Sequence, residues 1–330
     1  MFRLAVHSDD RHPQARVPAK HQPIVRRRVV AYLDDRGTWD VGRETGERQR
    51  AFSATVPAMD DLSSWTAEWP VGWASVAVTN ATATLGSGPD PSEPFRIASI
   101  SKTMVGLAAL VAIEEESIHL DEPAGPEGST VRHLLAHASG LGFDSLRQVS
   151  PVGKRRVYSN VGIEVFCEHL EKATGIAFVD YLSEAVFAPL GMGDTVLRGS
   201  PAHGVHSTIS DLLLFARELL DPTLISRNTM DMARRPHFSD LAGVLPGITS
   251  FDPNPFGLTF EIKDGKEPHW TSPLNSPETF GHFGGSGSFL WVDPPVGLAA
   301  VSLADEDFGA WSLDHWSEAS TRILRTYGAR

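Results

Sequence analysis

The sequence of 330 residues contains a single cysteine, Cys167. One thiol excludes a disulfide framework within the chain and a cysteine-based metal cluster. Because Cys167 lies in an apolar run of helical pattern, we expect it to be a buried structural thiol. No stretch reaches the length of a transmembrane span, and the N-terminal sequence lacks the apolar core of a signal peptide. We therefore expect the product of the sequence as written to stay in the cytoplasm.

Positive charge is also scarce, with 29 Lys and Arg against 41 Asp and Glu and a formal net charge of −12. The first fifty positions hold 11 of the 29 basic residues and have a net positive charge, and the rest of the chain is strongly acidic. Such a balance argues against a general affinity for nucleic acid or for an anionic membrane. The three arginines at 26–28 are therefore expected to form a solvated face.

Several common site signatures are missing. The sequence has no Gly-x-Ser-x-Gly elbow, no Walker loop and no Gly-x-Gly-x-x-Gly loop. The pairs His133/His137 and His203/His206 have a close spacing, but leucine follows His133 where a zinc-protease motif has glutamate. We interpret these histidines as structural, and the sequence predicts neither a metal nor a cofactor.

Strand-like patterns lie near both ends of the main part of the chain and helical patterns lie between them. The expected strands are 73–79, 81–85, 256–262, 286–292 and 297–304, and the expected helices are 59–69, 99–116, 131–138, 161–173, 178–187, 208–220, 224–235 and 310–326.

This order predicts three parts. Residues 58–117 and 276–330 would form one α/β domain, and residues 118–275 would form an inserted helical region, with the active site in the crevice between them. Residues 1–57 are expected to be an N-terminal tail that contains a possible small hairpin.

The most apolar helical run opens with Ser99 and Lys102, which lie three residues apart and therefore on one helix face. A serine hydroxyl is a poor nucleophile unless a base stands beside it. A lysine can be that base if burial lowers its pKa. The free backbone N–H groups of a helix start can also stabilise an oxyanion. We interpret Ser99 as a nucleophile and Lys102 as its activating partner.

Two further segments carry groups that such a dyad needs. Tyr158 has a phenol that can act as a base or proton shuttle near a lysine, and Asn160 has an amide that can hold a substrate or Lys102. The glycine-rich segment 281–287, which contains His282, is expected to be a loop directly before a strand. Its glycines would let backbone N–H groups approach a ligand.

The motifs Ser99-Ile-Ser-Lys102, Tyr158-Ser-Asn160 and His282-Phe-Gly284 resemble, in order and approximate spacing, those of the serine β-lactamase/penicillin-binding-protein superfamily. Residues 97–103 and 132–141 resemble most closely its class C branch, which includes family VIII esterases and D-aminopeptidase-like hydrolases. The resemblance covers about residues 70–325. It implies an α+β, β-lactamase/transpeptidase-like fold, in which an antiparallel sheet is flanked by helices from both chain ends and a mostly helical region is inserted.

The resemblance also implies the chemistry. Ser99 would be acylated, Lys102 and Tyr158 would take and return the proton, and water would then hydrolyse the acyl-enzyme. Asn160 would support the substrate and Lys102.

The third motif would line the substrate. His282 would stand where other members have a lysine or a histidine, with Gly284 beside it. The backbone N–H groups of Ser99 and Gly285 would form the oxyanion hole.

Phe283 departs from the pattern, because many β-lactam-recognising members have Thr or Ser there to bind the substrate carboxylate. A phenyl ring donates no hydrogen bond. The sequence therefore favours a carboxylesterase-type hydrolase with a small-molecule ester or amide substrate. Ser286 or Ser288 could replace the missing hydroxyl, so a β-lactamase, D-Ala-D-Ala carboxypeptidase or D-aminopeptidase is the alternative. A non-catalytic ligand-binding protein with this fold is a third interpretation, and the oligomeric state stays open.

Overall fold

The computed structural model describes residues 59–328, so the predicted tail and hairpin at 1–57 lie outside the described residues. A seven-stranded sheet has the order β1-β3-β2-β12-β11-β10-β9, and its neighbouring strands are antiparallel except for β1 and β3. The strands are β1 (Asp60–Asp61), β2 (Ala74–Thr79), β3 (Thr84–Ser87), β9 (Glu261–Ile262), β10 (Phe280–Gly284), β11 (Ser288–Asp293) and β12 (Leu298–Ala304).

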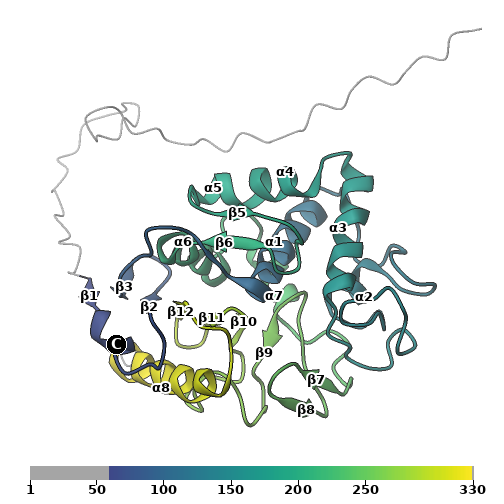
Figure 1. Ribbon diagram of the computed structural model, residues 1–330. Helices are drawn as coiled ribbons and strands as arrows, with labels where there is room; N and C mark the ends of the chain where they lie inside the picture. The colour runs from purple at the N-terminus through teal and green to yellow at the C-terminus, as the bar shows by residue number, and fades with distance from the viewer. Residues whose placement is uncertain (1–58, 329–330) are drawn as a thin grey trace, which may run out of the picture. The chain divides into compact units, whose positions relative to one another are not determined.

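The two faces of this sheet support two apolar layers. Side chains alternate along a strand, so Phe289 and Trp291 of β11 face α8 (Ala310–Tyr327), whereas Leu290 and Val292 face the layer of α1 and α6. Figure 1 shows α8 on one side of the sheet and α1 and α6 on the other. The predicted antiparallel sheet with helices from both chain ends is therefore confirmed.

The helix α1 (Ser101–Glu114) is the most buried helix, and it is apolar on nearly every side, as expected for a helix that lies between layers. The sequence had predicted Ser99 in the first turn of this helix, but Ser99 lies outside α1. It lies in a preceding 3-10 turn, η2 (Ala98–Ile100), and Ala98 has a left-handed φ of 43°. The turn changes the chain direction immediately before the helix begins.

In the middle of the chain, helices are separated by long loops and short strands, so this stretch is less helical than expected. Its helices are α2 (Val131–Leu135), α3 (Asn160–Thr174), α4 (Phe178–Leu182), η3 (Ser183–Phe187), α5 (Ala188–Leu190), α6 (Ile209–Leu220) and α7 (Arg227–Ala233). The predicted start of α6 is confirmed, because the Thr208 side chain accepts a hydrogen bond from the backbone N–H of Asp211. Gly175 ends α3 in a left-handed conformation, as expected for a helix C-terminus.

Some expectations were wrong. The predicted helix at 59–69 is β1 followed by the 3-10 turn η1 (Ser63–Thr66), and the strand predicted at 256–262 is reduced to β9. Five short strands had not been expected: β4 (Phe95–Arg96), β5 (Val196–Leu197), β6 (Val205–Ser207), β7 (Gly243–Leu245) and β8 (Thr249–Phe251). Strands of two or three residues are held by their tertiary neighbours and have too few positions to show a period.

The glycine-rich segment was also predicted wrongly, because most of it is the strand β10. Its glycines allow the close packing of this strand. A Cβ at Gly281 would lie 2.1 Å from the carbonyl oxygen of Leu290, and one at Gly284 would lie 2.3 Å from that of Ile97. The second contact places β10 directly against the turn that carries Ser99. No helix among residues 59–328 is long and apolar enough to cross a membrane.

Candidate active site

Ser99 is presented by a turn that is fixed on both sides. The Ser101 hydroxyl donates a hydrogen bond of 2.6 Å to the carbonyl oxygen of Ala98 and accepts one of 3.1 Å from the backbone N–H of Val205. The left-handed φ of Ala98 is unfavourable for a residue with a Cβ, so these contacts hold a strained backbone in place. The hydroxyl of Ser99 is thereby turned toward Lys102.

Lys102 is completely buried, and its Nζ contacts three acceptors. These are Ser99 Oγ at 3.2 Å, Asn160 Oδ1 at 2.6 Å and the carbonyl oxygen of Ala202 at 2.9 Å. Burial lowers the pKa of Lys102 to about 7, although the negative charges of Asp144 and Glu164 act in the opposite direction. Lys102 therefore exists in both protonation states near neutral pH.

The contacts of Lys102 decide where its lone pair points when the amine is neutral. The carbonyl oxygens of Asn160 and Ala202 can only accept, so they retain the two remaining N–H groups. The third tetrahedral direction, toward Ser99 Oγ, is then left to the lone pair. In this state Lys102 can accept the Ser99 proton.

Asn160 is held in one orientation by the start of α3. Its Nδ2 donates a hydrogen bond of 2.8 Å to Asp144 Oδ1, which leaves Oδ1 facing Lys102. The preceding Ser159 caps the helix by accepting a bond of 2.8 Å from the backbone N–H of Gly162. The motif Tyr158-Ser-Asn160 is thus both a helix cap and the anchor of the lysine.

Tyr158 lies against the same lysine. Its ring centroid is 4.8 Å from Lys102 Nζ, and its Oη is 3.1 Å from His282 Nε2. Burial raises the pKa of Tyr158 well above its usual range, and a hydrogen bond with Ser99 acts in the opposite direction. The phenol therefore keeps its proton at neutral pH.

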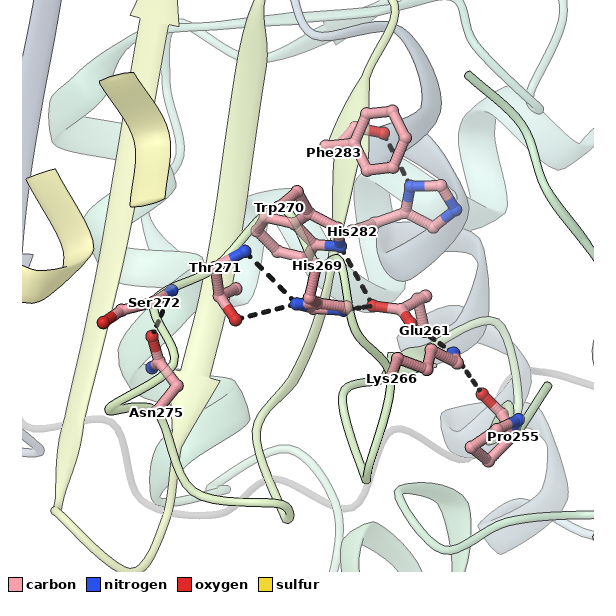
Figure 2. Close-up of polar contacts among 10 residues, drawn as sticks. All are labelled: Pro255, Glu261, Lys266, His269, Trp270, Thr271, Ser272, Asn275, His282 and Phe283. Carbon is pink, nitrogen blue, oxygen red and sulfur yellow. Dashed lines mark hydrogen bonds and ion pairs between the residues drawn. The ribbon is translucent and has the colours of Figure 1, made fainter. Parts of the chain in front are cut away.

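The contacts of His282 define its tautomer. Its Nδ1 lies 2.6 Å from the carbonyl oxygen of Phe283, and because a carbonyl only accepts, Nδ1 carries a hydrogen (Figure 2). Burial, followed by the charge of Lys102, lowers the pKa of His282 to about 3, so the ring is neutral. Its Nε2 is then an acceptor for the Tyr158 hydroxyl. The Tyr158 oxygen consequently has its lone pairs available for the Ser99 hydroxyl.

The glycines of the third motif lie close to the candidate nucleophile. The packing of Gly284 on Ile97 brings the end of β10 against η2. Gly285 follows β10, and its carbonyl oxygen accepts a hydrogen bond of 3.0 Å from the backbone N–H of Phe308. The oxyanion hole of Ser99 and Gly285 stays a prediction.

The structure thus brings together the side chains of Ser99, Lys102, Tyr158, Asn160 and His282, which the sequence had singled out. Three contributors were not predicted, namely Ala202, Asp144 and Glu164. Ala202 acts through its backbone, which no sequence pattern marks. Asp144 and Glu164 act by charge, and their positions become significant only in the folded chain.

His133 and His137, the first closely spaced pair, have structural contacts. His133 stacks on Phe238 with ring centroids 4.4 Å apart. His137 accepts a hydrogen bond from the Ser159 backbone N–H at 3.2 Å, and its ring lies 4.6 Å from that of Tyr158. His137 therefore supports the Tyr158 segment, a contact that its sequence spacing did not indicate.

A buried polar network, also unpredicted, stands next to β10 (Figure 2). The carboxylate of Glu261 binds Lys266 Nζ, His269 Nε2 at 2.9 Å and Trp270 Nε1 at 3.0 Å. Burial disfavours the charged form of Glu261, but Lys266 and His269 outweigh burial and hold its pKa well below its usual range. The network fixes Trp270 against Phe283, with ring centroids 5.8 Å apart.

The comparisons with known proteins concern the family of the chain. A family model described as Beta-lactamase matches residues 71–321. The crystal structure of a β-lactamase from Mycobacterium bovis is 47% identical to this chain, covers 80% of this chain and 98% of its own, and has a TM-score of 0.79. The structure of EstCE1, described as a hydrolase with promiscuous acyltransferase activity, is 17% identical, with coverages of 78% and 96% and a TM-score of 0.63. At that identity the likeness shows the fold alone.

Among curated sequences, penicillin-binding protein 4* of Bacillus subtilis is 29% identical over 31% of this chain and 30% of its own length. The chain spans about a third of the length of the curated relatives that it matches. The family model, in contrast, covers most of the chain, and the M. bovis structure matches it over nearly all of its own length. The resemblance of the three motifs is confirmed: the chain belongs to the β-lactamase family and is a serine hydrolase of the serine β-lactamase/penicillin-binding-protein superfamily.

Proposed function

We propose that this protein is a carboxylesterase-type hydrolase that forms an acyl-enzyme on Ser99. The observation that carries the proposal is the contact of 3.2 Å between Ser99 Oγ and the Nζ of the buried Lys102, whose other two partners are acceptors. Burial and uncharged partners make Lys102 a base near neutral pH, which is the requirement for activating a serine.

In the acylation step Ser99 Oγ attacks the ester carbonyl carbon, and the Ser99 proton passes to Lys102 Nζ. The carbonyl π electrons move to the oxygen, which the backbone N–H groups of Ser99 and Gly285 would stabilise. The tetrahedral intermediate then collapses, the bond to the alcohol oxygen breaks, and the alcohol leaves with the proton from Lys102. Tyr158, beside Lys102, is placed to relay this proton.

In the deacylation step a water molecule replaces the alcohol. Its oxygen attacks the acyl carbon while Lys102 takes one of its protons. The bond between the acyl carbon and Ser99 Oγ breaks, and Ser99 recovers its proton from Lys102. The products are the carboxylic acid and the free enzyme.

The side chains of the third motif favour a neutral ester over a substrate with a carboxylate. Phe283 is buried against Phe308 and Trp270, and its ring donates no hydrogen bond. The Ser288 hydroxyl donates to the carbonyl oxygen of Ile97 at 3.1 Å, so its proton is already used. In the Ser286–Ser288 contact of 3.2 Å the proton must then come from Ser286. Neither serine replaces the missing hydroxyl without rearrangement.

The charges near Ser99 support the same choice. His282 is neutral, and Lys102 carries only part of a positive charge near neutral pH. Asp144 and Glu164 add negative charge close to Lys102. A substrate carboxylate would therefore gain little attraction at this site.

A β-lactamase is the second candidate, and the observation in its favour is the 47% identity to the structure from M. bovis that is described as one. Turnover of p-nitrophenyl butyrate and of a chromogenic cephalosporin separates the two candidates. We expect kcat/KM to be at least about a hundredfold higher for the ester. A preference for the cephalosporin would reverse the assignment.

A fluorophosphonate probe tests the nucleophile and the rival non-catalytic interpretation together. We expect wild type to be labelled and Ser99→Ala to remain unlabelled. The control is Ser183→Ala, which removes an exposed serine hydroxyl on η3 and should still be labelled. Equal labelling of wild type and Ser99→Ala would exclude Ser99 as the nucleophile, and no labelling of wild type would favour a binding protein.

A further inference from the structure

Three of the most exposed large apolar side chains in the described part of the chain lie in one loop, residues 143–149. Phe143 is 48% exposed, Leu146 is 73% exposed and Val149 is 60% exposed. Single exposed apolar residues are common on protein surfaces, whereas three on one short loop make this loop a candidate binding surface. We call these three side chains the apolar lip.

The apolar lip is attached to the candidate active site. The Phe143 ring stacks on the Tyr158 ring with centroids 5.9 Å apart and an interplanar angle of 30°. The Phe143 carbonyl oxygen accepts a hydrogen bond of 2.8 Å from the backbone N–H of Asn160. The next residue, Asp144, holds the Asn160 side chain. The loop that carries the lip is therefore joined directly to Tyr158 and Asn160.

The loop is also closed on itself, so that its apolar side chains have a fixed support. The backbone N–H of Gly142 donates to the carbonyl oxygen of Arg147 at 3.0 Å, and that of Val149 donates to the carbonyl oxygen of Gly140 at 2.8 Å. A preformed surface binds a flexible chain without first losing conformational entropy of its own.

The proton path indicates which half of an ester lies on this side. Lys102 and Tyr158 return a proton to the leaving alcohol, so the alcohol oxygen must lie next to them. The Phe143 ring stacks on the ring of Tyr158, so the lip is the apolar surface attached to this proton donor. The alcohol part of the ester, rather than its acyl part, is therefore the part that continues over the lip.

We propose that the apolar lip binds the hydrocarbon chain of the alcohol in a neutral ester, so that the preferred substrates are esters of medium-length or long apolar alcohols. This inference rests on the proposed esterase function and names its substrate class. Each methylene that is half removed from water at the lip contributes about a twofold gain in kcat/KM.

The test measures acetate release from ethyl, butyl and hexyl acetate in a pH-stat, below the solubility limit of each ester. For wild type we expect kcat/KM to rise about fifteenfold from ethyl to hexyl acetate, which has four more methylenes. In the double variant Leu146→Ser/Val149→Ser the rise should fall below about threefold, with ethyl acetate turnover unchanged. These two side chains are exposed, so the variant is expected to fold.

The matched control is Val179→Ser/Leu274→Ser, which removes apolar side chains that are 44% and 53% exposed elsewhere on the surface. It should retain the full dependence on alcohol length. A second arm varies the acyl chain in p-nitrophenyl acetate, butyrate and hexanoate, and the lip variant should leave that profile unchanged.

The outcomes are distinguishable. If wild type hydrolyses none of these esters, the proposed function fails and this inference fails with it. If wild type hydrolyses them with equal kcat/KM for all alcohols, or if the lip variant keeps the wild-type rise, only the inference about the lip is overturned. An altered acyl profile would assign the lip to the acyl part instead. If the lip variant changes only the oligomeric mass in solution, the lip contacts a second copy and the proposal is wrong.

Discussion

Lys102 shows how a fold makes a base from a residue that is normally protonated. It is buried without an acidic residue among its hydrogen-bond partners, which are the uncharged groups of Ser99, Asn160 and Ala202. Burial disfavours the ammonium, and only the more distant Asp144 and Glu164 favour it. The pKa of about 7 is the balance of these effects.

This balance predicts the pH dependence of ester hydrolysis. The active form is the neutral amine, so kcat/KM should rise about tenfold per pH unit below about 7 and level off above it. In Asp144→Asn the loss of a negative charge disfavours the ammonium further, so the rise should move to lower pH. Asparagine keeps an oxygen for Asn160. The profile is measured with p-nitrophenyl butyrate between about pH 5 and about pH 9.

Glu164→Gln is the matched variant, because it removes the other negative charge without removing a group that holds Asn160. It should shift the profile in the same direction. An apparent pKa that stays unchanged in both variants, or that moves upward, would contradict Lys102 as the titrating base.

Tyr158 and His282 are expected to act as one unit, because the neutral imidazole accepts a hydrogen bond from the phenol. Tyr158→Phe and His282→Leu should each lower kcat by about a hundredfold. In the double variant the loss should be no larger than in the worse single variant, since the same hydrogen-bonded chain is removed once. Single-turnover kinetics of all four proteins measures this. Losses that multiply in the double variant would show that the two residues act independently.

At the scale of elements, the contact between β10 and η2 joins the glycine motif to the nucleophile turn. A Cβ on Gly284 would lie 2.3 Å from the backbone oxygen of Ile97, which cannot move without moving Ser99. A Cβ on Gly285 would meet no atom within 4 Å. The two neighbouring glycines therefore provide a matched pair.

Gly284→Ala should lower kcat by at least about a hundredfold and reduce thermal stability, because the turn is displaced. Gly285→Ala should keep kcat within about threefold of wild type, since its backbone N–H remains. Steady-state kinetics and thermal unfolding check both variants. Equal effects of the two substitutions would contradict the close packing of β10 on η2.

The network around Glu261 stabilises the segment that follows β9 and supports Phe283 through Trp270. Removing one partner of a buried ion pair leaves the other charge uncompensated. Glu261→Gln should therefore lower the free energy of unfolding by roughly 3 kcal/mol, as measured by denaturant titration. The double variant Glu261→Gln/Lys266→Met also removes the unpaired lysine charge, so it should recover part of this loss. A double variant less stable than Glu261→Gln would show that the unpaired charge of Lys266 does not destabilise the fold.

Elements with a clear local pattern were predictable and elements set by close packing were not. The strands β2, β11 and β12 are largely apolar runs of six or seven residues that are buried along their whole length, and α3 and α6 show their capping residues in the sequence. In β10 the glycines that permit packing on Ile97 also remove the side chains that would have marked a strand.

In the candidate site, too, local motifs were predictable and contacts between distant residues were not. The spacing of Ser99 and Lys102, and the motifs of Tyr158 and His282, are local patterns that a sequence displays. The tautomer of His282, the backbone acceptor at Ala202 and the ion pair of Glu261 depend on residues that meet only in the fold. No period or spacing in the sequence could have indicated these contacts.

At the scale of the whole molecule, the sheet separates two apolar layers, and the candidate site lies where the end of β10 meets η2 and the start of α3. One layer packs α1 and α6 against the sheet, and the other packs α8 against it. Residues from distant parts of the chain are thereby held on rigid elements, which is what an acyl-transfer site requires. The division into an α/β domain and an inserted region at 118–275 stays a prediction.

The acyl-enzyme itself is the central claim, and intact-mass spectrometry tests it most directly. Wild type mixed with p-nitrophenyl butyrate and quenched in acid should gain one butyryl group, which peptide mapping should place on Ser99. Ser99→Ala should gain none. An adduct on another residue, or rapid ester turnover by Ser99→Ala without an adduct, would contradict the account.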